Sequence, residues 1–429
     1  MKKRQMAIFT RQLNCMGGIE RVVIEQVRIF KHHGLEVVLL LEEEPNYKGY
    51  LFDCRCIVLP MECKCRVKVL ENFLKAQSLD SVIFHGLSRK FAKIDVVTFS
   101  QFNVATVVAI HFPFHQTIAL DCGYNAIADY TNRGEGCTAF ATVSAIDAVF
   151  WRALGKKAFH VQNPFVHPSK NVERCQRDGK DGLANLLWVG RLCEQKQPAS
   201  ALVAFALALK VCPNITLTMV GGDIKGIKSL QKKALRLGIL EKVEFVPERP
   251  DINEYWEKAD IHLLTSICES FCLVWAEAKA AGIPTVMFDL PYLELAEDKR
   301  GYIAVEQRNV QALADAIIAL VNDGKRRLSM GCEAKASLAP FNDEAVWESW
   351  ARVFEGINET NAGLEVDADL KTIVSQVYMA VCYDKDTHRW PEEMVTDWQK
   401  VTRTSMRPIA NALHWVVGAL QKIKAKIRE

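Results

Sequence analysis

Two glutamates stand eight residues apart in the stretch Cys268-Glu269-Ser270-Phe271-Cys272-Leu273-Val274-Trp275-Ala276-Glu277-Ala278. A short apolar run, 261–264, precedes this stretch and another, 285–288, follows it. Strand, loop, helix and strand in this order predict one unit of a parallel α/β sheet. Glu269 then lies in the loop before the helix and Glu277 about two turns into it. Between them, the start of the helix offers unpaired amides and a positive dipole end, which favour an anion.

A ligand that carries both hydroxyls and a diphosphate explains two carboxylates beside an anion site. The sugar and ribose hydroxyls of a nucleotide-sugar need acceptors, whereas its diphosphate needs donors. The glutamates are therefore interpreted as hydroxyl acceptors, and neither is predicted to be a nucleophile. A solvated helix face is the alternative, and the apolar neighbours of Glu277 weaken it.

Short apolar runs alternate with amphipathic helices along the chain, as in parallel sheets covered on both faces. A helix over 19–30 repeats its apolar residues with helical periodicity, and Gly34 is placed to end it. The strands predicted in the first half are 6–9, 36–41, 81–84, 106–110, 139–143 and 159–162. Those predicted in the second half are 185–189, 216–220, 243–246, 261–264, 285–288 and 302–304, with helices at 310–321 and 346–354.

The predicted fold class is α/β, with two Rossmann-like domains that face a central cleft and a C-terminal helical extension. A polar and charged segment after Asn163-Pro164 predicts the linker between them. The predicted parts are an N-terminal domain, a linker, a nucleotide-sugar-binding domain, a closing helix and an extension, at 1–163, 164–183, 184–340, 341–358 and 359–429.

Composition excludes several classes of protein. An apolar content of 49% and a charged content of 24% over 429 residues are those of a well-packed globular chain. The net charge of +3 is too small to indicate a nucleic-acid partner. No apolar run reaches the length of a membrane span. The apolar segment after the basic start is interrupted at Arg11, so it predicts a first strand rather than a signal peptide. A cytoplasmic location is therefore expected.

The cysteines are expected to be buried thiols of a reducing compartment. One cluster, Cys54-x-Cys56 and Cys63-x-Cys65, resembles a metal site. A zinc site would favour two-residue gaps within each pair and a longer separation between the pairs. Side chains two apart on a strand face the same way, and this explanation is preferred.

Three further features begin where predicted strands end. Arg191 and Lys196 follow 185–189 and offer a planar fork and a point charge for a diphosphate, against the alternative of solvated loop cations. Gly17 and Gly18 allow close approach of backbone to ligand, although tight turns use such a pair equally. His111 is placed to bond a substrate hydroxyl or shield developing charge, and a structural histidine is its alternative.

Together these features resemble the retaining nucleotide-sugar glycosyltransferases of family 4, which have the GT-B fold. The resemblance covers residues 5–355 and is stronger in the second domain. The matching pieces are Gly17-Gly18-Ile19-Glu20-Arg21, Asn163-Pro164, Val189-Gly190-Arg191-Leu192 with Lys196, Val220-Gly221-Gly222, Glu269 with Glu277, Ala281-Gly282-Ile283-Pro284 and Gly301.

By this resemblance, Arg191 and Lys196 bind and neutralise the donor diphosphate, Glu269 accepts hydroxyls of the transferred sugar, and Glu277 holds the ribose. His111 matches a histidine near the donor sugar. The catalytic set is therefore expected to be Glu269, His111, Arg191 and Lys196. The resemblance places the remaining donor-binding residues at Gly17, Gly18, Gly221, Arg249, Ser270, Phe271, Cys272, Leu273 and Glu277.

The resemblance also implies the partners. A UDP- or GDP-linked sugar is the expected donor, a glycan or lipid-linked hydroxyl the acceptor, and polysaccharide or surface-glycan synthesis the setting. No cofactor and no metal are expected, since the pairs Asp367/Asp369 and Asp384/Asp386 lie in the tail. Ser270 and Cys272 depart from the family, which has glycines near these positions. Their side chains are expected to tighten the pocket or alter donor choice.

The tail adds a possible membrane contact. Apolar residues from Ile409 to Ile427 recur at steps of three and four, with lysines on the other faces, which predicts an amphipathic helix. It either docks on its own protein or lies on the inner face of the plasma membrane. Two functional alternatives also stay open: a sugar-nucleotide epimerase of the same fold, and a catalytically silent partner of another transferase. The oligomeric state is left open.

Overall fold

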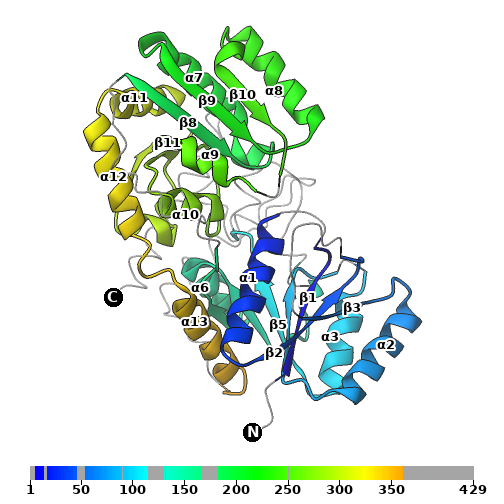
Figure 1. Ribbon diagram of the computed structural model, residues 1–429. Helices are drawn as coiled ribbons and strands as arrows, with labels where there is room; N and C mark the ends of the chain where they lie inside the picture. Colours follow the sequence, from blue (N-terminus) through cyan, green and yellow to red (C-terminus); the bar gives the residue numbers. More distant parts are fainter. Residues whose placement is uncertain are drawn as a thin grey trace, which may run out of the picture. The chain divides into compact units, whose positions relative to one another are not determined.

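The computed structural model describes residues 5–13, 17–45, 54–88, 90–114, 130, 132–165, 182–249 and 251–360. The chain divides into two compact units, one up to Pro164 together with the segment from Asp343 onward, the other from Phe165 to Asn342. Both are parallel α/β structures, so the predicted fold class is confirmed (Figure 1). Most of the predicted linker, and the tail after residue 360, lie outside the described residues.

The first unit has a seven-stranded parallel sheet in the order β3-β2-β1-β4-β5-β6-β7. Its central strands are almost wholly buried, as expected for a sheet covered on both faces. The strands are β1 (Gln5–Thr10), β2 (Glu36–Leu41), β3 (Arg55–Val58), β4 (Ser81–His85), β5 (Ala105–Ile110), β6 (Ala139–Thr142) and β7 (Ala158–His160). The helices are α1 (Gly18–His32), α2 (Cys63–Ala76), α3 (Ala92–Gln101), α6 (Ala145–Ala153) and α13 (Asp343–Gly356).

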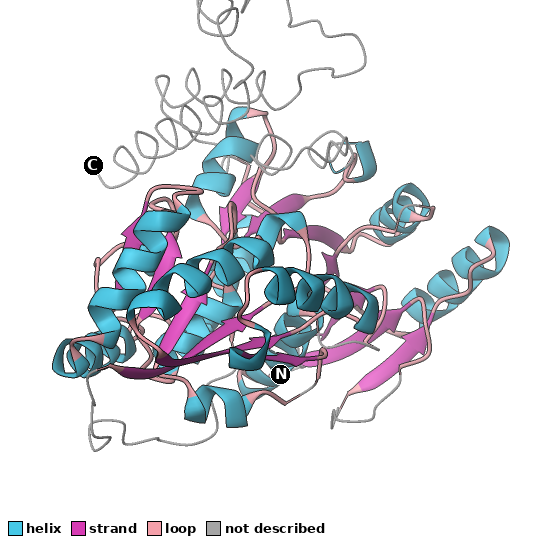
Figure 2. Cartoon of the chain, turned by 90° about the horizontal axis from the view of Figure 1, so that it is seen from above, coloured by secondary structure: helices cyan, strands magenta, loops and turns pink. Residues whose placement is uncertain are grey.

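The second unit has a six-stranded parallel sheet in the order β10-β9-β8-β11-β12-β13. Its strands, drawn in magenta in Figure 2, are β8 (Leu183–Val189), β9 (Asn214–Val220), β10 (Val243–Val246), β11 (Ile261–Leu264), β12 (Thr285–Phe288) and β13 (Tyr302–Val305). The α-helices are α7 (Pro198–Val211), α8 (Ile224–Arg236), α9 (Asn253–Lys258), α10 (Leu273–Ala280), α11 (Val310–Val321) and α12 (Gly324–Ala336). Short 3-10 turns lie at η2 (Glu194–Lys196), η3 (Leu240–Lys242) and η4 (Glu294–Ala296).

In both sheets the strand order reverses once, between β1 and β4 and between β8 and β11. Connections leave such neighbouring strands in opposite directions, so a crevice opens at their carboxyl ends. The fold therefore singles out four loops for function: those after β1 and β4 in the first unit and those after β8 and β11 in the second.

Helix α13 returns to the first unit and packs against α1. Arg28 of α1 donates two hydrogen bonds to the Asp343 carboxylate, at 2.8 and 2.9 Å. Phe30 contacts three aromatic rings of α13, those of Trp347, Trp350 and Phe354. The segment predicted as a closing helix after the second domain is thus part of the first compact unit.

Gly301, one of the residues that carried the family resemblance, has a packing reason to be glycine. Its φ is +77°, and a Cβ there would lie 2.4 Å from the Cα of Ala334 in α12. Backbone contact between the start of β13 and α12 therefore excludes any side chain at this position.

The strand explanation of the cysteine cluster is half wrong. Cys56 lies in β3 and Cys54 directly before it, but Cys63 and Cys65 lie in the first turn of α2. Residues two apart on a helix point to different sides, so their spacing has no strand origin. Metal binding gains nothing from this correction, because no group of three or more candidate ligands occurs among the described residues.

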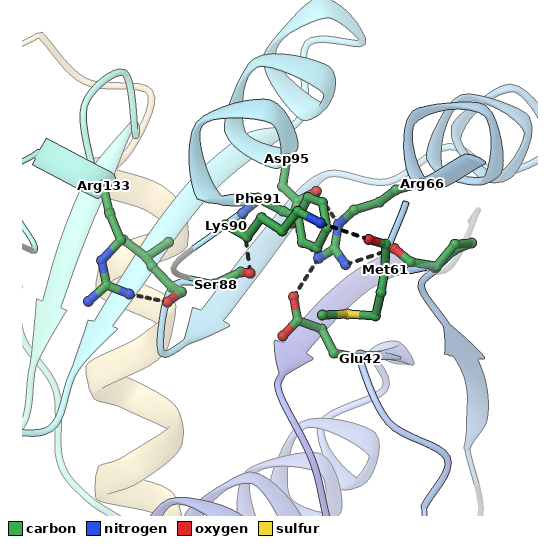
Figure 3. Close-up of polar contacts among 10 residues, drawn as sticks. Glu42, Met61, Arg66, Ser88, Lys90, Phe91, Asp95 and Arg133 are labelled. Atoms are coloured by element: carbon green, nitrogen blue, oxygen red, sulfur yellow. Dashed lines mark hydrogen bonds and ion pairs between the residues drawn. The ribbon is translucent and has the colours of Figure 1, made fainter. Parts of the chain in front are cut away.

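A buried arginine ties α2 to the rest of the first unit (Figure 3). Arg66 is fully buried, and its guanidinium bonds both Asp95 oxygens at 2.7 and 2.6 Å and lies 3.2 Å from Glu42. The ring of Phe91 lies 4.5 Å away on its face. Burial raises the pKa of Asp95 in spite of the neighbouring cation. One cation thus compensates two carboxylates inside the core, Glu42 just after β2 and Asp95 in α3.

Removing this cation should destabilise the first unit strongly. Arg66→Met leaves two buried carboxylates without a partner, and we expect the free energy of unfolding to fall by about 3–5 kcal/mol. Urea denaturation measures it. Lys93→Met is the matched control, because Lys93 pairs with Glu135 at 2.9 Å on the surface, and it should unfold at the wild-type midpoint. Equal losses of unfolding free energy in the two variants would show that Arg66 does not stabilise the core of the first unit.

Candidate active site

The predicted phosphate ligands lie at the reversal of strand order in the second unit. Arg191 and Lys196 occupy the loop after β8, and Glu269 occupies the loop after β11. These strands are neighbours in the sheet although more than 70 residues separate their loops. The topology therefore brings three of the four expected catalytic residues to one end of one sheet.

Lys196 and Glu269 form a buried ion pair. The Nζ of Lys196 lies 2.5 Å from Oε1 of Glu269, and the side chains are 13% and 8% exposed. Burial is the largest influence and lowers the pKa of Lys196, but the charge of Glu269, the neighbouring Cys272 and the hydrogen bond to Glu269 together outweigh it, so the net shift is upward. Lys196 is consequently a permanent cation at neutral pH, held at the carboxyl edge of the sheet.

Two residues that the sequence did not single out hold the loops together. Gln195 donates from Nε2 to the carbonyl oxygen of Cys268 at 2.8 Å and accepts from the Arg191 Nη2 at 3.4 Å. Thr265 accepts from the indole of Trp188 at 3.0 Å and donates to the carbonyl of Lys196 at 2.7 Å. Only the position of Gln195 between two predicted residues hinted at its role.

A third unpredicted residue fixes the backbone of Glu269. The hydroxyl of Tyr292 accepts the Glu269 amide proton at 3.1 Å, and Tyr292 is itself buried. The position of the Glu269 carboxylate is therefore set from both its side chain and its main chain.

The segment Ser270, Phe271 and Cys272 is buried and leads directly into α10, which begins at Leu273. Cys272 is the N-cap and has φ +72°, a left-handed conformation that is costly for a side chain with Cβ. Its carbonyl accepts from the amides of Trp275 and Ala276, and burial raises the pKa of its thiol. Cys272 is thus a strained residue between Glu269 and the start of α10.

Glu277 lies in α10 with an exposed fraction of 2%. A solvated helix face, the alternative considered from the sequence, is therefore wrong for this glutamate. A carboxylate buried to this extent needs partners that compensate its charge, which is typical of a functional or a structural site rather than of a surface.

The loops after β8, β9 and β10 approach each other through backbone. Gly221 has φ +130°, and a Cβ on it would lie 2.1 Å from the carbonyl oxygen of Gly190. The amide of Gly221 donates to Val246, and Gly222 accepts from Glu248. Arg249 follows on this loop, where its guanidinium bonds Glu254 at 2.9 Å and the Tyr255 hydroxyl of α9. The structure does not bring Arg249 into contact with Lys196 or Glu269.

In the first unit, the predicted residues follow β1, which borders the reversal, and β5, which pairs with β4. Gly17 caps α1 and Gly18 begins it, and His111 comes directly after β5. The Nε2 of His111 lies 2.9 Å from Nδ1 of His85, whose Nε2 lies 2.5 Å from Oε1 of Gln26. Burial lowers the pKa of His111 to about 4, and burial and His111 lower that of His85 further below its usual range. His85 ends β4 and so carried the same positional signal as His111, which the sequence analysis did not use.

No helix in the part of the chain that the structure describes is long and apolar enough to cross a membrane.

Residues 172–337 match the model of the family described as glycosyl transferases group 1. An uncharacterized glycosyltransferase of Haemophilus influenzae is 23% identical, over 81% of this chain and 99% of that protein. The D-inositol 3-phosphate glycosyltransferase of Corynebacterium urealyticum is 31% identical, but the match covers 38% of this chain and 40% of that protein.

The structure of HepE from Anabaena in complex with UDP-glucose is similar, with a TM-score of 0.66 at 17% identity over 82% of this chain and 99% of that one. A likeness at this identity shows a shared fold. The two parallel-sheet units, the family match of the second unit and these relatives together support a GT-B glycosyltransferase.

Proposed function

We propose that the chain is a retaining glycosyltransferase of family 4, which moves a hexose from a nucleotide-sugar to a hydroxyl of a glycan or lipid-linked acceptor without a metal ion. The Lys196–Glu269 pair carries this proposal. It sets a permanent cation and a hydroxyl acceptor side by side, at the carboxyl edge where such sheets bind ligands. The likeness to HepE, solved with UDP-glucose, favours UDP as the nucleotide.

Donor binding exchanges the partners of the pair. The diphosphate takes Lys196 and Arg191 as its counter-charges, while the amides at the start of α10 add donors. Glu269 then accepts from hydroxyls of the transferred sugar, and Glu277 accepts from the ribose. Gly221 lets the backbone approach the ligand closely.

In the transfer step, the bond between the anomeric carbon and the diphosphate oxygen breaks and the acceptor oxygen bonds to the same face of that carbon. The acceptor proton passes to the departing phosphate oxygen, so neither glutamate is a covalent nucleophile. Arg191 and Lys196 stabilise the charge that accumulates on the diphosphate, which is the electrostatic contribution expected to dominate the rate. No step uses a metal ion, because Arg191 and Lys196 together stabilise the charge on the diphosphate.

The chain should act on a nucleotide-sugar in the presence of EDTA. A panel of UDP- and GDP-sugars, scored for nucleotide release, hydrolysis and epimerisation, separates the proposed transferase from the alternatives. A transferase releases nucleotide and, with an acceptor, yields a product of retained anomeric configuration by NMR. Epimerisation without an acceptor indicates the epimerase. If the panel shows neither binding nor turnover, the chain is a silent partner and the proposal is wrong.

The two glutamates should fail in different ways. Glu277→Gln removes a charged acceptor from the ribose, so we expect UDP to bind roughly 10- to 100-fold more weakly. Glu269→Gln should lower kcat and leave UDP affinity unchanged or improved, because UDP has no hexose and the substitution frees Lys196. Calorimetric titration with UDP and steady-state kinetics with the UDP-sugar measure both. The reversed pattern would exchange the assigned roles.

A further inference from the structure

A chain of three polar side chains crosses the reversal of strand order in the first unit. Gln26 comes from α1, which follows β1, His85 ends β4, and His111 follows β5. Gln26 is fully buried, His85 is 3% exposed and His111 is half-buried. The two imidazole rings are inclined by 21° with centroids 5.0 Å apart. Of these three residues, only His111 belongs to the catalytic set expected from the sequence.

Hydrogen-bond chemistry gives this chain a direction. The Oε1 of Gln26 can only accept, so the His85 Nε2 beside it carries a proton. A neutral imidazole has one proton, which leaves a lone pair on the His85 Nδ1. That nitrogen faces the His111 Nε2 at 2.9 Å, and the His111 proton must therefore be on Nε2. The lone pair of His111 is then on Nδ1.

Both rings are neutral at pH 7, since burial lowers the pKa of each. Two imidazolium rings at this separation would repel each other, and the amide oxygen of Gln26 could not compensate both charges. Consecutive hydrogen bonds polarise one another, so a substitution of Gln26 changes the hydrogen bonding of His111 as well.

We propose that Gln26 and His85 are positioning residues that hold His111 as a single neutral tautomer, with the proton on Nε2 and the lone pair on Nδ1. In this tautomer, Nδ1 of His111 accepts a hydrogen bond from a hydroxyl and does not donate one to a phosphate. The assignment of a sugar hydroxyl as the bonding group rests on the proposed function, whereas the tautomer does not.

The tautomer is measured directly by long-range proton–nitrogen NMR correlation of the full chain with 15N-labelled histidine. Spectra of His85→Phe and His111→Phe assign the signals. At pH 7, both rings should show a protonated Nε2 and an unprotonated Nδ1. A proton on Nδ1 of either ring, or two protons on either ring, would overturn the proposal.

Two substitutions of Gln26 test the direction of the chain. Gln26→Leu removes the terminal acceptor, so both rings should change to a mixture of tautomers. Gln26→Glu still offers only an acceptor and should keep the wild-type tautomers. A single unchanged tautomer in Gln26→Leu would show that Gln26 does not set it.

Kinetics supplies the functional test. Gln26→Leu should lower kcat/KM for the nucleotide-sugar roughly three- to tenfold, as expected for one misdirected hydrogen bond, and Gln26→Glu should restore most of it. Thr98→Val, which removes a buried 2.8 Å bond to the Ile94 carbonyl in α3, is the matched control and should leave kcat/KM unchanged. Equal losses in Gln26→Leu and Thr98→Val would indicate a purely structural role and contradict the proposal. Correct tautomers without turnover of any nucleotide-sugar would instead refute the proposed function and leave the tautomer assignment intact.

Discussion

The ion pair between Lys196 and Glu269 is the constraint on which the second unit's site depends. A lysine and a carboxylate as buried as these are stable only while each compensates the other, and loss of one leaves the other uncompensated. The pair therefore fixes the loop after β8 against the loop after β11. The same two loops are also held by hydrogen bonds from Gln195 to Cys268, from Thr265 to Lys196 and between Tyr292 and the Glu269 amide. A diphosphate that takes the lysine must offer the glutamate a new partner, and the hydroxyls of a sugar are such a partner.

The first unit uses the same place in its own sheet for a different kind of contact. Its strand order also reverses once, and there a neutral chain from Gln26 through His85 to His111 replaces the ion pair. A charged cluster lies elsewhere in the first unit, where the Arg66 guanidinium compensates Glu42 and Asp95 in the core. One unit thus presents paired charges at its reversal of strand order, and the other presents an oriented dipole.

Local patterns predicted most of the fold because each strand is a short apolar run between turn residues. The bounds of β2, β10, β11, β12 and α11 agree with the prediction. The pattern failed at Cys63 and Cys65, whose spacing was attributed to a strand but which lie in the helix α2. The positions of Lys196, Glu269 and His111 after strands were also visible in the sequence. Their partners were not, because contacts such as that of Gln195 with Cys268 join residues far apart in the chain, and their geometry exists only after the sheet that carries both loops has formed.

The central claim is that Lys196 is the counter-charge of the donor diphosphate, and the affinity for UDP tests it most directly. Lys279→Met is the control, because Lys279 is a buried lysine of the same unit whose Nζ bonds Ser337 and the Arg300 carbonyl. Calorimetric titration should show that Lys196→Met weakens UDP binding roughly 10- to 100-fold, the loss expected for a charged hydrogen bond, while Lys279→Met binds UDP like the wild type. Wild-type affinity in Lys196→Met, or equal losses in both variants, would contradict the account.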